Sequence, residues 1–149
     1  MCQDAYMGLQ VRDLSRVLRA LADPTRLRIL ALLGTGEVCV CHVHESLRIP
    51  QPKASRHLAY LRRAGLVGTR RQGLWVYYRL AEGAEPALDA VRSAATHALG
   101  HAEAAGRDVA RLRSRTGRVV RVPAKAPAVR CCARRRAGGP RQKAGSRVP

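Results

Sequence analysis

The cysteines are the residues of this sequence best able to do chemistry. The chain contains five, an odd number without a secretory context, so we expect free thiols or metal ligands rather than a disulfide framework. Cys39 and Cys41 lie two positions apart, and thiolates are soft ligands that prefer thiophilic ions to magnesium or calcium. The alternative is that both are small residues of a core.

The spacing of these residues limits how they can meet one ion. On a regular helix, Cys39 and Cys41 would point about 200° apart. They can share an ion only if Cys39 precedes the helix or the first helical turn deforms. Cys41 and His44 are spaced i, i+3 and can share a helix face. We therefore expect ion binding to distort the helix that carries Cys41.

A second group of residues has the pattern of a nucleic-acid contact. After Pro52, an amphipathic run with Ala54, Leu58 and Leu61 on one stripe predicts a helix with a basic outer face, and a hairpin with a basic tip follows. Such a helix can enter the major groove, and the tip can reach the DNA backbone or minor groove. The candidate DNA contacts are Gln51, Lys53, Ser55, Arg56, His57 and Tyr60 in the helix and Arg70, Arg71 and Gln72 in the hairpin.

Two alternatives remain open at this surface. His57 can serve packing as well as DNA contact, and the whole region can be a solvated amphipathic helix beside an ordinary hairpin. The neighbouring elements favour the first interpretation, because a short helix and a tight turn precede the basic helix. Together these features predict a winged helix-turn-helix.

The rest of the pattern predicts a mainly helical chain. Apolar spacing indicates a helix over residues 11–21, and Asp23-Pro24 is typical of a helix start that continues to Gly34. A short helix is expected over residues 41–47. The hairpin should span residues 66–80 with its turn at Gln72-Gly73, and a last helix with small apolar residues should run from Leu88 to Ala102. The expected fold class is therefore α+β, mainly α with a small β-hairpin wing.

Composition agrees with one small helical domain. The chain has 149 residues, of which 46% are hydrophobic, but no Phe and only 3% aromatic residues. Aliphatic packing between helices is therefore favoured over an aromatic-layered β-sandwich. No run approaches the roughly 20 apolar residues of a membrane span, and the first residues lack the pattern of a signal peptide. We expect a cytoplasmic protein with no membrane partner.

Charge divides the chain near Gly106. The sequence has 28 Lys and Arg against 10 Asp and Glu, a net charge of +18 that favours a polyanionic partner. Residues 107–149 hold half of the basic residues and one acid, Asp108. We expect a DNA-binding and dimerisation domain over residues 1–106 and a mostly disordered basic tail over 107–149. A GC-rich coding region without selected function would produce a similar tail.

Four blocks in order resemble one regulator family. They are DPTRLRIL (23–30), EVCVC (37–41), QPKASRHL (51–58) and GLWVYYRL (73–80). They are similar to the ArsR/SmtB metalloregulators, especially the arsenical-resistance operon repressors with a Cys-Val-Cys motif. The resemblance covers residues 10–100 approximately. It implies a homodimer that binds double-stranded operator DNA and is released by a metal or metalloid. We expect the first and last helices to form the dimer contact.

The resemblance also implies a ligand set, from which this chain departs. The arsenical type uses three thiolates; the first two match Cys39 and Cys41, but His44 replaces the third. Cys131 or Cys132, whose arginine neighbours favour the thiolate form, could supply the third, with Cys2 as a lesser candidate. The related zinc sensors use late histidines, but we interpret His97 and His101 as a surface pair.

The expected inducer is therefore As(III) or Sb(III), with other thiophilic ions possible and no constitutive cofactor. Two alternatives keep the same fold: a thiol redox switch, and a sensor of zinc, cadmium or lead. A third is a non-specific basic DNA-binding or metalloid-sequestering protein. No nucleotide-binding glycine loop or nucleophile motif is visible, so we do not expect an enzyme.

Overall fold

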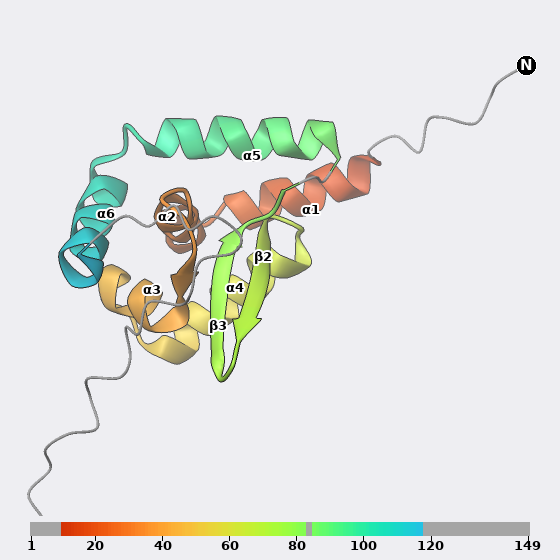
Figure 1. Ribbon diagram of the computed structural model, residues 1–149. Coiled ribbons are helices and arrows are strands. Elements are labelled where there is room, and N and C mark those ends of the chain that lie inside the picture. Colours follow the sequence, from red (N-terminus) through yellow and green to blue (C-terminus); the bar gives the residue numbers. More distant parts are fainter. Residues whose placement is uncertain (1–9, 83–84, 118–149) are drawn as a thin grey trace, which may run out of the picture.

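The computed structural model describes residues 10–82 and 85–117. The described elements are α1 (Val11–Leu21), α2 (Pro24–Leu33), β1 (Val38–Cys39), α3 (Val40–Leu47), α4 (Gln51–Arg63), β2 (Val67–Gln72), β3 (Trp75–Leu80), α5 (Pro86–Leu99) and α6 (Glu103–Thr116). Figure 1 shows α1 and α2 between α5 on one side and α3, α4 and the strands on the other. No helix in the described ranges is long and apolar enough to cross a membrane.

The start of α2 follows the expected capping pattern. Asp23 is the N-cap, and its Oδ1 accepts a hydrogen bond from the Arg26 backbone N–H at 2.8 Å, while Pro24 occupies the first turn. Burial raises the pKa of Asp23, but the Arg26 hydrogen bond and the charges of Arg26 and His57 outweigh it. The net result is a pKa below the ordinary value of 3.8.

The strands form a three-stranded antiparallel sheet in the order β1-β3-β2. The expected hairpin is present, but its turn lies one residue later than predicted, because Gln72 still pairs with Trp75 and Gly73 takes a positive φ of 58°. Strand β1 has only two residues, too few for an alternating pattern to reveal it. It pairs Val38 with Tyr78 and Cys39 with Tyr77.

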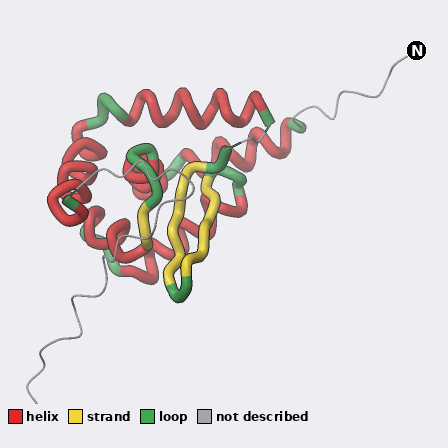
Figure 2. The backbone as a smooth tube through the Cα atoms, viewed as in Figure 1, coloured by secondary structure: helices red, strands yellow, loops and turns green. Residues whose placement is uncertain are grey.

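The core joins α1–α4 to the base of the hairpin. Ile29, Leu30, Leu58, Leu61 and Leu66 are among its fully buried side chains. Helix α3, the turn at residues 48–50, α4 and the β2–β3 wing form a winged helix-turn-helix, and Figure 2 shows how little strand the helical body contains. The predicted fold class is confirmed.

The end of the domain differs from the sequence prediction. The helix predicted from Leu88 to Ala102 corresponds to α5, which ends at Leu99. After a turn at Gly100 and an extended residue, Ala102 (φ −85°, ψ 119°), a further helix follows, α6, which was not predicted. The boundary expected after Gly106 falls inside α6, where Asp108 and Leu112 are buried. Residues 107–117 therefore belong to the folded body. The rest of the expected tail, with Cys131 and Cys132, and the N-terminal Cys2 lie outside the described residues.

Candidate nucleic-acid interface and thiol site

The outer face of α4 is polar and basic. Ala54, Leu58 and Leu61 anchor the inner face in the core. Gln51, Lys53 and Arg56 are exposed and Ser55 is partly exposed. Lys53 and Arg56 have no ion-pair partner within the described part of the chain. These side chains can approach phosphates and base edges without first breaking a contact.

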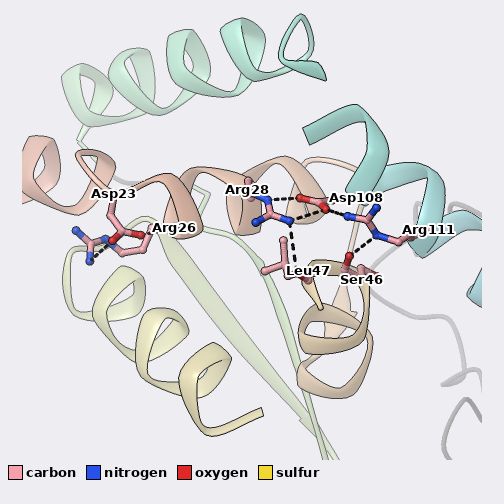
Figure 3. Close-up of polar contacts among 7 residues, drawn as sticks. All are labelled: Asp23, Arg26, Arg28, Ser46, Leu47, Asp108 and Arg111. Atoms are coloured by element: carbon pink, nitrogen blue, oxygen red, sulfur yellow. Dashed lines mark hydrogen bonds and ion pairs between the residues drawn. The ribbon is translucent and has the colours of Figure 1, made fainter. Parts of the chain in front are cut away.

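His57 and Tyr60 have internal partners on α2. His57 Nδ1 lies 3.7 Å from Asp23 Oδ1, and the Arg26 guanidinium stacks over the Tyr60 ring at 4.3 Å from its centroid. Arg26 also donates from Nε to the Ala20 carbonyl at 2.6 Å (Figure 3 shows Asp23 and Arg26). The position of His57 agrees with the packing role that the sequence left open. Tyr60 contributes packing even though it remains exposed.

The two wing arginines differ in their surroundings. Arg70 forms a bidentate contact with Glu37, with Nε 2.9 Å and Nη2 2.6 Å from Oε2. It also donates from Nη1 to Gln72 Oε1 at 2.9 Å and lies over the Tyr77 ring. The hydrogen bond with Glu37 raises the pKa of Arg70 above its ordinary value. Arg71, by contrast, is exposed. Of the two, Arg71 is therefore the one available to DNA.

Glu37 was not among the predicted site residues. It lies 33 positions from Arg70, and no local spacing relates the two. Only the sheet brings them together, since β1 and β2 flank β3 on opposite sides.

The two thiols lie at the start of α3. Cys39 is 2% exposed, belongs to β1 and is the N-cap residue of α3 with extended backbone (φ −79°, ψ 158°). Cys41 is the second residue of the helix and is partly exposed, and neither cysteine is in a disulfide within the described residues. Cys39 thus precedes the helix, which is one of the two arrangements that allow both thiols to reach one ion.

The described residues do not assemble a complete metal site. Among them, no three His, Cys, Asp or Glu side chains are grouped so as to hold an ion. His44 lies further along α3 and does not form such a cluster with Cys39 and Cys41. To hold an ion, Cys39 and Cys41 therefore need either a movement of α3 that brings in a third ligand or a donor from another part of the chain.

The other end of α3 is held by α2 and α6. Arg111 Nε donates to the Ser46 carbonyl at 2.6 Å, and Arg28 Nη2 donates to the Leu47 carbonyl at 3.4 Å (Figure 3). The buried Asp108 carboxylate accepts hydrogen bonds from both arginines. Cations at this position complement the negative end of the α3 dipole. Sequence reasoning missed this cluster and assigned Asp108 to the tail.

Two further features concern α1 and α5. Val11 is 84% and Leu18 is 50% exposed on α1, where they line a shallow apolar groove with Leu14 and Ala22. Helix α5 has 14 residues, none of them buried. At its end, the rings of His97 and His101 stand edge to face at 5.4 Å.

Basic outer face, paired wing and helical body together define a winged helix-turn-helix regulator. Residues 23–69 match the arsR family of bacterial regulatory proteins. A transcriptional regulator from Methanocaldococcus jannaschii is 42% identical over 69 residues, which cover 46% of this chain and 78% of that protein. The chain therefore belongs to the arsR family of bacterial regulatory proteins.

Two other comparisons agree with this family. The arsenic resistance transcriptional regulator ArsR1 of Pseudomonas putida is 48% identical over 80 residues, covering 51% of this chain and 62% of that protein. A homodimeric winged helix-turn-helix domain from Mycobacterium bovis superposes with a TM-score of 0.52 and 31% identity, covering 64% of this chain and 93% of that one. The match thus spans less than two thirds of the Pseudomonas protein. These names describe regulators, in agreement with the prediction that the chain is not an enzyme.

Proposed function

We propose that this protein is a metal(loid)-responsive repressor that binds operator DNA as a homodimer in the cytoplasm. The observation that carries the proposal is the position of Cys39. Cys39 is the last residue of β1, which pairs with the wing strand β3. It directly precedes α3, the first helix of the helix-turn-helix. An ion bound there acts on both DNA-binding elements.

Helix α4 is the proposed reading element. Arg56 and Ser55 contact base edges in the major groove, while Gln51 and Lys53 contact the backbone. Arg71 at the wing contacts the flanking phosphates. Arg70 positions the wing through its contacts with Glu37 and Gln72. His57 and Tyr60 position α4 through their contacts with Asp23 and Arg26.

The proposed dimer buries the apolar faces of α1 and α5. Val11 and Leu18 are large apolar side chains with little cover in the isolated chain, and α5 lies alongside the same region (Figure 1). A two-fold dimer would place two α4 helices in successive major grooves. The homodimeric Mycobacterium bovis domain supports this arrangement.

The proposed inducer is As(III) or Sb(III), bound by Cys39 and Cys41. Each As–S bond forms as a thiol proton and an arsenite hydroxyl leave together as water. The soft donors support this choice, as do the similarity and the name of the Pseudomonas regulator. Zinc, cadmium and lead are other thiophilic ions that the same thiols can bind.

The proposed third donor is Cys131 or Cys132, with His44 as the alternative. Arg115 Nη1 contacts Glu45 Oε2 at 2.7 Å, so the end of α6 lies against α3. Glu45 follows Cys41 by four residues and shares its helix face. From Gly117, a span of 14 residues reaches at most about 50 Å, ample for a thiol one helical turn away.

The test compares arsenite-induced release from the operator in the wild type and five variants. The Cys39→Ser and Cys41→Ser variants should bind operator DNA like the wild type and resist release, because neither thiol is on the outer face of α4. Cys2→Ser tests the lesser donor candidate and should respond normally if Cys131 or Cys132 supplies the third donor. Cys131→Ser/Cys132→Ser should respond weakly if the tail supplies the third donor. Arsenite release that survives in Cys39→Ser/Cys41→Ser would overturn the site.

The redox alternative is separated by the same variants. If Cys39 and Cys41 form an oxidised pair, hydrogen peroxide should release the wild-type protein and dithiothreitol should restore binding. Release by arsenite under reducing conditions favours the metalloid sensor instead.

A further inference from the structure

Strand β1 connects the proposed ion site to the wing. Cys39 pairs with Tyr77 of β3, and Tyr77 pairs on its other side with Arg70 of β2, so the three residues form one row across the sheet. We infer that Glu37 and Arg70 couple an ion at Cys39 to the position of the wing. This inference rests on the proposed function and adds the route by which ion binding lowers the affinity for DNA.

A single side chain bridges the row. The Arg70 guanidinium crosses the Tyr77 ring, 5.1 Å from its centroid, and reaches Glu37 two residues before Cys39. The Glu37 carboxylate accepts from both Nε and Nη2 of Arg70. Backbone pairing and this ion pair therefore tie the outer strand of the wing to the segment that enters β1.

Burial makes movement of β1 a condition for ion binding. Cys39 is 2% exposed and its neighbour Val38 is 4% exposed. An arsenite molecule and a second thiolate cannot reach the Cys39 sulfur until this segment shifts. Because β1 pairs with β3 through only two residue positions, the shift disrupts little backbone structure. A short strand is thus suited to open when the ion binds.

The shift reaches DNA through the wing. When β1 moves, Glu37 moves with it and displaces its ion-pair partner Arg70. Arg70 is adjacent in sequence to Arg71, the proposed phosphate contact. The hairpin then leaves the position in which both α4 and the wing fit the operator. Loss of the wing contact lowers affinity without any change on the outer face of α4.

The test uses Glu37→Gln and a matched control, Glu82→Gln. Both variants remove one negative charge near the hairpin. Glu82 is the ion-pair partner of the wing residue Arg79, and neither of these two residues is paired with β1. Trp75, the one tryptophan of the chain, begins β3 and reports the wing by its fluorescence. Arsenite binding is measured by equilibrium dialysis, and operator affinity is measured with and without arsenite.

In the wild type and Glu82→Gln, arsenite should shift Trp75 emission and weaken operator binding. Glu37→Gln should bind arsenite with the same stoichiometry, yet show a smaller Trp75 shift. The ratio of its operator affinity without arsenite to that with arsenite should be about 10-fold smaller than in the wild type. A full Trp75 shift and full release in Glu37→Gln would overturn this inference alone. Failure of the wild type to bind arsenite would overturn the proposed inducer, and the coupling with it.

Discussion

Arg28 of α2 and Asp108 of α6 lie 80 positions apart and meet through two hydrogen bonds, from Nε to Oδ2 at 2.5 Å and from Nη2 to Oδ1 at 2.8 Å. Arg111 shares the same carboxylate, and both arginines also reach carbonyls at the end of α3. The hydrogen bond to Asp108 raises the pKa of Arg28 above its ordinary value. One buried acid therefore joins α2 and α6 at the end of α3, the helix that carries Cys41.

Replacing Asp108 with Asn should destabilise the fold. The carboxylate is fully buried, and its loss leaves two guanidinium groups without their counter-ion. Because both arginines keep some contact with water, we expect the free energy of unfolding to fall by about 2–4 kcal/mol in urea titrations. Asp13→Asn removes an exposed ion pair with Arg16 and should cost less than about 0.5 kcal/mol. Equal losses of unfolding free energy in the two variants would contradict the role of Asp108 in joining α2 and α6 at the end of α3.

Asp23 should make stability depend on pH at the acid end. Its folded pKa lies below 3.8, so the unfolded chain takes up a proton first as the pH falls. The stabilisation is present above about pH 4 and is lost as the pH falls through the folded pKa. Asp23→Asn keeps an N-cap acceptor but removes the titration, and should flatten this part of the curve. Unfolding followed by circular dichroism between pH 2 and 6 at about half-unit steps tests this; an unchanged slope in Asp23→Asn would exclude Asp23 as its source.

Local sequence patterns predicted most of the helices and the hairpin, but they did not predict contacts between residues far apart in the sequence. The Asp23 cap and the Leu58–Leu61 stripe are readable because their partners lie within one or two helical turns. Helix α5 ends at Leu99 rather than at the predicted Ala102, because small residues continue the apolar pattern beyond its end, and α6 was missed because most of its residues were assigned to the basic tail. Glu37–Arg70 and Arg28–Asp108 join residues 33 and 80 positions apart, and no spacing rule connects such pairs.

The exposed face of α1 should be required for dimerisation. Leu18→Asp places a charge on the apolar groove of α1, and because Leu18 is already half exposed, the isolated subunit should keep its fold. Analytical ultracentrifugation should show a dimer for the wild type and a monomer for the variant at about micromolar concentration, with operator affinity at least 10-fold lower. Leu74→Asp, which changes an even more exposed leucine at the hairpin turn, is the control and should remain dimeric. A Leu18→Asp dimer would move the interface away from α1.

Arg56 and Arg71 should differ in the kind of DNA affinity they contribute. Arg56→Ala removes a proposed base contact and should cost about 1–3 kcal/mol on the operator and less on random DNA. Arg71→Ala removes a proposed phosphate contact, so it should weaken binding to all sequences and reduce the salt slope by about one. Fluorescence anisotropy on operator and scrambled duplexes at several salt concentrations separates the two. A uniform loss in Arg56→Ala would reassign it to the backbone.

Two truncations should separate the folded body from the basic segment that follows it. We propose that this segment begins at residue 118, because α6 packs against α2 and α3 through Asp108, Leu112 and Arg115. Removing residues 118–149 takes away ten Lys and Arg and no acid, so affinity for all DNA should fall and the salt slope should flatten, while the melting temperature stays the same. Removing residues 107–149 also deletes Asp108 and should lower the melting temperature by several degrees. If removal of residues 118–149 lowers the melting temperature as much as removal of 107–149, residues after 117 contribute to the fold. If removal of 118–149 abolishes the preference for the operator over random DNA, these residues contribute to sequence recognition.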